Sequence, residues 1–294
     1  MITRRRLLAI SAACLACPAT AAPVRWQGRA LGAEAHLTFH APEKLALAAL
    51  RAVRQEIATA EALFSLFTPV SALSLLNAQG ALHQPAPDFT ALMTLAGTAH
   101  HLTGGAFDPT IQPLWQALTR GTDIAAAAAL IGWDHVHVSA DRITLGKGQQ
   151  LSLNGIAQGY ITDMVARRLR ALGLHKVLVN IGEFAAIGGP WRLGISDPEF
   201  GLVGTRILSD RAIATSSARA TTLRGRSHIL DPGPGGNGPL WSTASVEADS
   251  ATLADALSTA FILLPLPRIQ HIVATAPERL NVVLAGFDGQ IHTL

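Results

Sequence analysis

Short strand-like segments recur between helical segments in the second half of the chain, and no other feature constrains the fold as much. Apolar residues in these segments either alternate with polar ones or form brief runs bounded by glycine, proline or aspartate. Short hairpin strands mixed with helices indicate an α+β fold with a mostly antiparallel sheet. The expected strands cover residues 177–181, 191–195, 212–216, 227–230, 241–246 and 281–284.

The first half of the chain supplies most of the expected helices. From Pro42 to Phe64 apolar residues recur every three or four positions, which predicts a helix with one buried face. Asp88 is placed to cap a further helix that extends through Leu102. No internal repeat or break in composition is visible, so a single domain is expected. The other predicted elements are an opening strand within 24–40, a short helix before Asn77, a hairpin of 136–138 with 143–145, and a strand from residue 151 that leads into a helix ending at Leu172.

Residues 1–21 have the composition of an export signal. Arg4, Arg5 and Arg6 precede a short apolar run, and Ala-Thr-Ala at 19–21 offers a small-residue cleavage site. The apolar run is too short to span a bilayer. A lipid anchor at Cys17 is disfavoured, because the leucine expected three residues before a lipidated cysteine is absent. We therefore expect a twin-arginine-type signal peptide over 1–21, a folded domain over 22–294, and a periplasmic location.

Charge and cysteine content exclude several classes of function. The chain has 23 Lys and Arg against 20 Asp and Glu, and three of its arginines leave with the leader, so 20 remain against 20. A mature chain with balanced charge gives no electrostatic reason to expect nucleic acid as a partner. Both cysteines, Cys14 and Cys17, also lie in the leader. The mature protein is therefore expected to have no disulfide, thiol nucleophile or cysteine-bound metal.

Residues 249–260 contain the side chain with the strongest chemical implication. The sequence Asp-Ser-Ala-Thr-Leu-Ala-Asp-Ala-Leu-Ser-Thr-Ala is typical of a helix that Asp249 or Ser250 caps. Asp255 lies in the middle of this small, apolar helix, where a carboxylate is costly unless something satisfies it. Thr259 follows one turn later on the same face.

A carboxylate and a hydroxyl on one helix face suit Mg²⁺, which takes one or two protein oxygens and leaves its other positions to water and phosphate. The alternative is a structural aspartate, either exposed or capped locally by Ser258 or Thr259. Taken alone, the residues of this helix favour that alternative.

Two glycine-containing segments are further candidates for a binding site. Residues 103–110, Thr-Gly-Gly-Ala-Phe-Asp-Pro-Thr, let the backbone approach a ligand; an ordinary turn with an Asx-type bond from Asp108 is the alternative. Residues 151–160 place a glycine turn at a helix start, where backbone N–H groups can bind a phosphate. His135 and His137 are expected on one strand face, as a surface pair rather than a metal site, because no third ligand is near.

The order of these segments resembles that of the ApbE family, the FAD:protein FMN transferases. The resemblance covers nearly all of the mature chain, and its most specific parts are His-Ile-x-Asp-Pro at 228–232 and Ala-Asp-Ala-Leu-Ser-Thr at 254–259. It favours the ligand interpretation of Asp255 over the structural one. The other matching motifs are Phe-Ser-x-Phe-x-Pro-x-Ser-x-Leu-Ser-x-Leu-Asn at 64–77, Thr-Gly-Gly-Ala-Phe-Asp-Pro at 103–109, Gly-Ile-Ala-Gln-Gly-Tyr at 155–160, Asn-Ile-Gly at 180–182 and Ala-Thr-Ser at 214–216.

The resemblance implies a single ApbE-like domain over 22–294 and a Mg²⁺-dependent enzyme. Such an enzyme splits FAD at its pyrophosphate, attaches FMN to a threonine or serine of an exported or membrane-bound acceptor protein, and releases AMP. A metal ion and backbone donors suffice for this chemistry without a covalent enzyme intermediate, which agrees with the absence of cysteine.

The resemblance also assigns roles to individual residues. It implies that His228 activates or orients the acceptor hydroxyl, since a neutral imidazole can accept a proton near pH 7. The implied metal ligands are the side chains of Asp255 and Thr259, the adjoining Ser258 and the carbonyl of Gly155. The implied FAD-binding positions are Leu31, Phe67, Ala106, Phe107, Asp108, Ser152, Gln158 and Leu230.

The sequence departs from the family pattern at three positions. Ser152 and Gln158 stand where the family commonly has Asp and Lys, and Glu183 follows Gly182 where a second glycine is usual. The first two changes remove charge from FAD contacts, so a periplasmic FAD-binding protein without transferase activity remains an alternative. A pyrophosphatase that cleaves FAD to FMN and AMP is another, and a structural interaction protein is a more distant one.

Overall fold

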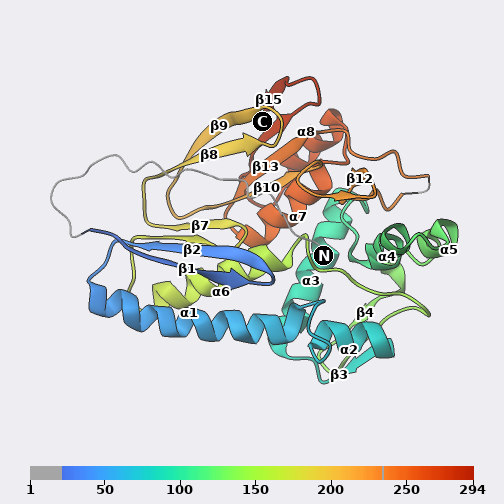
Figure 1. The fold of residues 1–294 in the computed structure, drawn as a ribbon, viewed down its shortest axis with the longest axis horizontal. Helices are drawn as coiled ribbons and strands as arrows, with labels where there is room; N and C mark the ends of the chain where they lie inside the picture. The colour runs from blue at the N-terminus through green and yellow to red at the C-terminus, as the bar shows by residue number, and fades with distance from the viewer. Residues whose placement is uncertain (1–21, 234) are drawn as a thin grey trace.

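The structure, a computed structural model, describes residues 22–233 and 235–294. Its centre is an antiparallel sheet with the strand order β1-β2-β6-β7-β10-β13-β14-β15, and helices cover one face of it (Figure 1). The predicted α+β fold with a mostly antiparallel sheet is therefore confirmed. The strands are β1 Val24–Ala30, β2 Ala33–Phe39, β6 Val177–Asn180, β7 Phe184–Ile187, β10 Ala212–Ser217, β13 Thr243–Ala248, β14 Asn281–Ala285 and β15 Ile291–Thr293.

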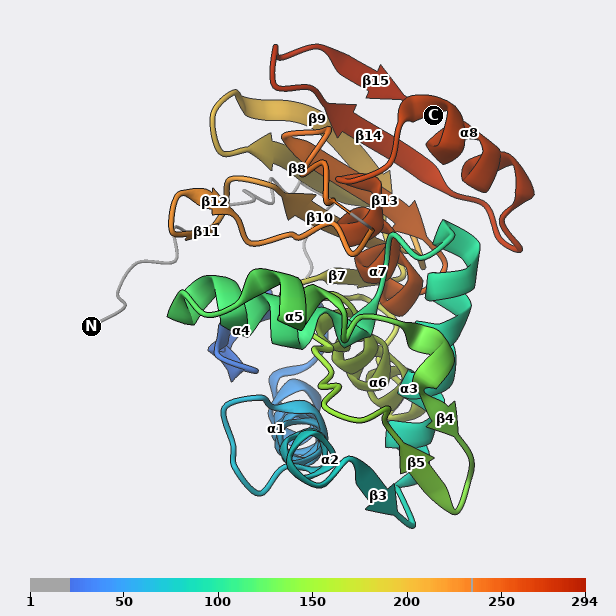
Figure 2. The same ribbon diagram turned by 90° about the vertical axis from the view of Figure 1, so that its right-hand side faces the viewer.

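The helices form a layer beneath the sheet and a group at one end of it. Helix α6 packs against β6 and β7, α7 packs against β10 and β13, and α1 covers α6 from outside. Figure 2 shows α4 and α5 at the end of the molecule, with α7 behind them. The helices are α1 Glu43–Phe64, α2 Ala72–Gln79, α3 Pro87–Thr103, α4 Gln112–Arg120, α5 Ile124–Ala128, α6 Ala157–Ala171, α7 Ala251–Phe261 and α8 Leu266–Thr275.

Side-chain alternation along the strands separates two apolar cores. In β7, Ala185 and Ile187 join the large core beneath the helices, whereas Phe184 and Ala186 face a smaller core on the other side of the sheet. The hairpin of β8 Trp191–Asp197 and β9 Gly201–Leu208 covers that smaller core. The sheet is thus buried on both faces over its centre, which gives the helices beneath it a rigid support.

Two smaller sheets complete the fold. β3 Ala81–His83, β5 Arg142–Thr144 and β4 His137–Val138 form one of them, which confirms the predicted hairpin and adds a strand to it. β11 Thr222–Leu223 and β12 Arg226–Ser227 form the other. His135 lies in a 3₁₀ turn, Trp133–His135, and not on the strand of His137, so the predicted histidine pair on one strand face is wrong.

Three further local predictions are wrong. Asp88 does not cap α3, which begins at Pro87; its carboxylate instead accepts a hydrogen bond from the Tyr160 hydroxyl at 2.8 Å. Residues 151–154 are not a strand, because the side chain of Asn77 pairs with the backbone of Leu151 in place of a neighbouring strand. Of the strand expected at 227–230, only Ser227 is paired, in β12.

Helices α6 and α7 are fixed against each other at two points. The carboxylate of Asp163 in α6 accepts hydrogen bonds from the backbone N–H groups of Ala251 and Thr252, both at 2.9 Å, at the start of α7. Ser250 completes this cap by accepting from Leu253. A Cβ atom on Gly159 would lie 2.2 Å from the carbonyl oxygen of Ala251, so only glycine permits this close crossing.

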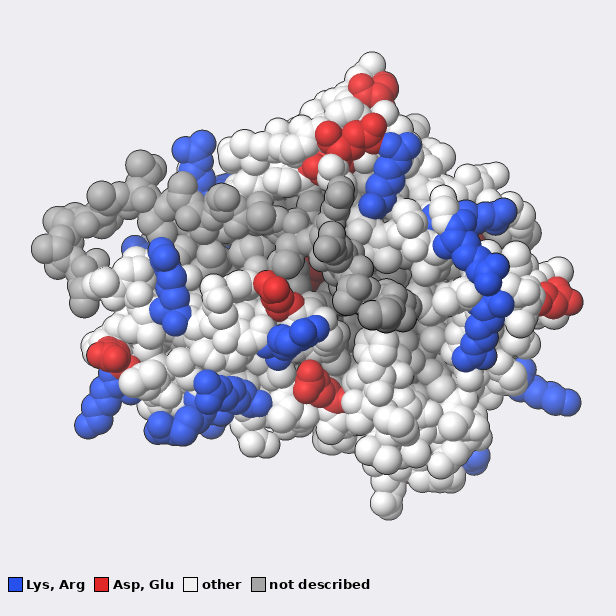
Figure 3. All heavy atoms as spheres, viewed as in Figure 1, with Lys and Arg blue, Asp and Glu red and all other residues white. Residues whose placement is uncertain are grey.

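The surface shows no single-sign stripe on the face seen in Figure 3, where Lys and Arg are spread over several parts and interspersed with Asp and Glu. Within the part of the chain that the structure describes, none of the helices combines the length and the apolar character needed to cross a bilayer. The predicted signal peptide over 1–21 and Cys17 lie outside the described residues.

Candidate active site

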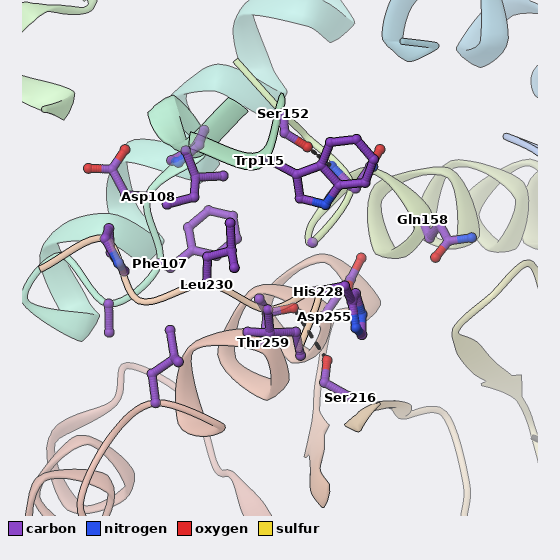
Figure 4. A pocket seen from close by; sticks show the side chains of 18 of the residues that line it. Phe107, Asp108, Trp115, Ser152, Gln158, Ser216, His228, Leu230, Asp255 and Thr259 are labelled. Atoms are coloured by element: carbon purple, nitrogen blue, oxygen red, sulfur yellow. Dashed lines mark hydrogen bonds between the residues drawn. The ribbon is translucent and has the colours of Figure 1, made fainter. Parts of the chain in front are cut away.

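A pocket of about 250 Å³ opens between α4, α7, the end of β10 and the segment after β12. Figure 4 shows side chains from these separate parts of the chain turned toward one space. The pocket brings together most of the residues predicted from the sequence. Its lining is Ala106, Phe107, Asp108, Pro109, Ile111, Trp115, Ser152, Asn154, Gly155, Gln158, Glu183, Thr215, Ser216, Ser217, Ala220, His228, Ile229, Leu230, Pro232, Asp255, Thr259 and Leu263.

Asp255 is the buried carboxylate of α7. Its side chain is 3% exposed, and its Oδ2 accepts a hydrogen bond from the backbone N–H of Gly159 at 3.0 Å, so it is neither an exposed aspartate nor a locally capped one. Burial raises the pKa of Asp255 to about 7; the hydrogen bond from Gly159 opposes this shift and the nearby Asp163 carboxylate adds to it. A buried carboxylate with one hydrogen bond is stabilised by a cation or by a proton.

Glu183 places a further carboxylate in the same pocket as Asp255, and the sequence did not identify it as a site residue. It lies between β6 and β7, is 8% exposed, and accepts a hydrogen bond from the Thr215 N–H at 3.2 Å. Burial and the neighbouring Asp255 carboxylate raise the pKa of Glu183 well above its ordinary range. The available signal was the acidic residue in place of a glycine after Gly182.

Hydroxyl groups line the pocket beside Asp255. A Cβ atom on Gly155 would lie 3.0 Å from the Thr259 Oγ1, so the backbone of this turn passes close to the Thr259 hydroxyl. The Ser216 Oγ lies 3.3 Å from the same oxygen and 2.9 Å from the Ser258 Oγ. Ser258 itself is fully buried, donates to the Asp255 carbonyl and does not line the pocket. Ser216, which the site prediction lacked, occupies the pocket-facing position beside Thr259.

His228 enters the pocket from the segment that follows β12. Its Nδ1 lies 3.0 Å from the carbonyl oxygen of Thr221. Because a carbonyl can only accept, Nδ1 carries the proton in this contact, and in the neutral ring Nε2 holds the lone pair. The carbonyl of Thr221, next to the β11–β12 hairpin, thereby favours the tautomer protonated at Nδ1, which leaves Nε2 able to act as a general base. The hydrogen bond from Arg224 Nε to the carbonyl of Thr119, at 3.3 Å, ties this hairpin to the end of α4.

The loop at 103–109 lines the other wall. Ala106, Phe107 and Asp108 all face the pocket, but the Asp108 Oδ1 accepts hydrogen bonds from the Thr110 N–H at 2.8 Å and from its hydroxyl at 2.6 Å. The Asx-type bond considered as the alternative is therefore present. The Asp108 carboxylate holds the turn into α4, and its Oδ2 lies 3.5 Å from the His100 Nδ1.

Two predicted FAD-binding residues lie outside this pocket. Leu31 is in the turn between β1 and β2, and Phe67 follows α1 and is 71% exposed. The two segments are neighbours, since a Cβ atom on Gly32 would lie 4.0 Å from the Phe67 ring. Ser152, Gln158 and Leu230, in contrast, line the pocket.

The pocket contains carboxylates but neither lysine nor arginine among its lining residues. In the described part of the chain no three His, Cys, Asp or Glu residues form a cluster suited to a metal. A cation here would rely on mixed oxygen donors: the carboxylate of Asp255, the hydroxyl of Thr259 and the carbonyl of Gly155. Such a set fits Mg²⁺, a hard cation that takes few protein ligands and completes its shell with water and phosphate.

The fold and the site define an α+β protein with an acidic, oxygen-rich pocket. The sequence matches the ApbE family over residues 31–284, and the chain belongs to that family. A relative, the FAD:protein FMN transferase of Klebsiella pneumoniae (strain 342), is 27% identical over 90% of this chain and 84% of its own.

Two solved structures share the fold. The apo form of the Pseudomonas stutzeri flavinyl transferase ApbE is 25% identical, with a TM-score of 0.78 over 92% of this chain and 94% of its own. The apbe protein of Thermotoga maritima is 22% identical, with a TM-score of 0.81 over 92% of this chain and 96% of its own, and supports the fold alone.

Proposed function

We propose that this protein is an FAD:protein FMN transferase that moves FMN from FAD to a threonine or serine hydroxyl of an acceptor protein. The relatives' names support flavin transfer in general. The observation that carries the finer proposal is the convergence of Asp255, Thr259, the Gly155 turn and His228 on one pocket. In the reaction the acceptor oxygen bonds to the FMN phosphorus, the bond from that phosphorus to the bridging oxygen breaks, and AMP leaves with that oxygen.

Asp255, Thr259 and the Gly155 carbonyl would hold Mg²⁺ at the pyrophosphate. When bound, Mg²⁺ supplies positive charge that stabilises the transition state of phosphoryl-type transfer. This fits the lining, because a pyrophosphate would otherwise meet the carboxylates of Asp255 and Glu183 with no lysine or arginine to offset them. The burial of Asp255 keeps its carboxylate in one place for this task.

His228 would take the proton of the acceptor hydroxyl at Nε2. The Thr221 carbonyl holds Nδ1 in its protonated form, so the ring accepts at the other nitrogen. Phe107 and Leu230 provide apolar surface on the same wall as the loop at 103–109, suited to a planar flavin. The pocket is smaller than the roughly 300–1,000 Å³ of typical small-molecule sites, so FAD would extend beyond it.

Mass spectrometry of an acceptor peptide tests the proposed function. The protein is incubated with FAD, Mg²⁺ and a threonine-bearing peptide from an acceptor protein, and the peptide should gain the mass of FMN less one water while AMP appears. Omission of Mg²⁺ with a chelator should prevent the gain. Release of FMN and AMP without peptide labelling would instead indicate a pyrophosphatase, and retention of intact FAD would indicate a binding protein.

Restoring the family's charges at positions 152 and 158 is expected to tighten FAD binding. The double substitution Ser152→Asp and Gln158→Lys adds an acidic acceptor and the first lysine to the lining, and charge-assisted hydrogen bonds are stronger than neutral ones. We expect FAD affinity to rise by about tenfold, as for one added charged hydrogen bond of roughly 1.5 kcal/mol. Fluorescence titration of FAD measures it.

Gln79→Lys is the control for this comparison, because it adds the same positive charge on the exposed end of α2, outside the pocket. It should leave FAD affinity unchanged. Unchanged or weaker binding in the double variant would mean that the pocket has been rebuilt around other residues. The periplasmic location remains a proposal that rests on the sequence of residues 1–21 alone.

A further inference from the structure

Glu183 is a buried acid that the proposed reaction does not yet use. It reaches the pocket from the turn between β6 and β7, whereas Asp255 reaches it from α7, so two separate elements bring carboxylates to one space. The side chains are 8% and 3% exposed. Two carboxylates buried together repel each other and lose hydration, so the fold retains them at a cost that some partner must offset.

For other buried carboxylates of this protein, neighbouring side chains and backbone groups compensate for the lost hydration. Glu247 pairs with the Arg211 guanidinium at 2.7 Å. Asp197 accepts hydrogen bonds from the hydroxyls of Ser242 and Thr243 and from the backbone N–H groups of Glu199 and Phe200. The protein thus supplies either an opposite charge or a full set of donors where a carboxylate is structural.

Glu183 and Asp255 have neither arrangement. The hydrogen bonds identified for them in the described residues are one from Thr215 N–H to Glu183 and one from Gly159 N–H to Asp255. The pocket lining contains no lysine or arginine. A divalent cation held by Glu183 and Asp255 would supply the positive charge that no lysine or arginine of the lining provides.

We propose that Glu183 is a second carboxylate ligand of the divalent cation, acting together with Asp255 from a separate element of the fold. This inference rests on the proposed function, which requires a cation at Asp255. Oxygen donors of this kind favour Mg²⁺ or Mn²⁺ over softer metals. Glu183 then raises the affinity for the cation before FAD binds, and a pocket loaded in this way accepts the pyrophosphate anion that the empty carboxylates would repel.

Calorimetric titration of Mn²⁺ into the FAD-free protein tests the assignment. Glu183→Gln keeps the size of the side chain and an oxygen that can accept from Thr215 N–H, but it removes the charge. Mutation of a residue that only supports a metal ligand typically weakens metal binding by about 10- to 100-fold. Loss of a carboxylate ligand itself should weaken Mn²⁺ binding by at least this factor. Glu247→Gln is the matched control, because Glu247 is equally buried but lies outside the pocket, and it should leave the Mn²⁺ affinity unchanged.

Thermal unfolding provides a second readout that a purely structural glutamate would not give. Without metal, Glu183→Gln relieves repulsion with Asp255, so its unfolding midpoint should equal or exceed that of the wild type. The upward shift caused by Mn²⁺ should be smaller than in the wild type, because binding to the native state stabilises it in proportion to affinity. If Glu183→Gln fails to fold, Glu183→Asp keeps the charge on a shorter stem and is expected to bind Mn²⁺ with reduced affinity.

The outcomes separate this inference from the proposed function. One outcome would overturn the role of Glu183 and leave the transferase proposal intact. In it, Glu183→Gln, or Glu183→Asp if only that variant folds, binds Mn²⁺ with wild-type affinity, while Asp255→Asn loses binding. Failure of the wild-type protein to bind Mn²⁺ or Mg²⁺ at all would overturn both. Weakened binding in both variants, with Glu247→Gln unaffected, supports the two-carboxylate site.

Discussion

The Asp255→Asn variant is expected to transfer FMN about a thousand times more slowly than the wild type while remaining folded. The carboxylate supplies the charge that holds the cation, and a bound metal ion stabilises the transition state by several kcal/mol. Because about 1.4 kcal/mol corresponds to a factor of ten in rate, loss of the ion slows the reaction by about three orders of magnitude. The asparagine oxygen can still accept from the Gly159 N–H, so the contact between α6 and α7 survives. Single-turnover labelling of an acceptor peptide in Mg²⁺ measures the loss.

Thermal unfolding of the same variant shows whether the loss is chemical. Because asparagine removes an uncompensated buried charge, the metal-free protein should unfold at the wild-type temperature or above it. Asp141→Asn, at an exposed turn, makes the same chemical change away from the pocket and should leave transfer unchanged. Transfer at the wild-type rate by Asp255→Asn in Mg²⁺ would falsify the metal assignment and remove the main physical support for the transferase.

The periodicity of α7 made the helix and the unusual position of Asp255 within it predictable from the sequence, whereas the choice of a ligand role over a structural one depended on the resemblance to the ApbE family. Ser250 caps the helix, Leu257 and Phe261 are buried at helical spacing, and Asp255 lies on the buried side with them. Prediction from local spacing failed for residues 151–154. There the buried Leu151 and Leu153 alternate with less buried residues, as they would in a strand. Their backbone pairs with the Asn77 side chain and the Pro109 carbonyl, a long-range substitution that no local pattern indicates.

Glu183 shows the limit of prediction for the site. Its proposed role depends on Thr215 of β10 and Asp255 of α7, which are distant in the sequence and lie beside the turn before β7 in the fold. A sequence can mark an acidic residue where a glycine is usual, but burial and charge balance are properties of the assembled pocket. Ser258, an implied metal ligand, does not line the pocket: the adjoining Thr259 faces the pocket, whereas Ser258 contacts Ser216 and the carbonyl of Asp255 in its own helix.

Two of the strands that the sequence missed, β7 and β9, lack the burial pattern by which a strand is recognised. β7 is a run of four buried residues. β9 is largely exposed, and its pairing with β8 has an irregularity between Ile195 and Ser196. Neither has the clear alternation that identifies a strand with one buried face. β7 is buried because it is covered on both sides, by α6 and by the β8–β9 hairpin, which becomes evident only when the layers are assembled.

The His228→Ala variant is expected to transfer FMN roughly two to four orders of magnitude more slowly, the effect typical of removing a general base. Its metal affinity should not change, since His228 lies on the segment after β12 and the proposed oxygen ligands lie elsewhere. The labelling assay measures the first quantity, and Mn²⁺ titration measures the second. His137→Ala, on the exposed edge of β4, is the control and should retain full transfer.

The two variants together separate the two halves of the site. Asp255→Asn should lose metal binding and transfer together, whereas His228→Ala should lose transfer alone, because the proton acceptor is held by the Thr221 carbonyl and not by the cation. If His228→Ala also lost metal binding, the imidazole would be a ligand, and its orientation by Thr221 would serve the metal. If His228→Ala kept the wild-type transfer rate, the hydroxyl proton would leave by another route, such as transfer to solvent water.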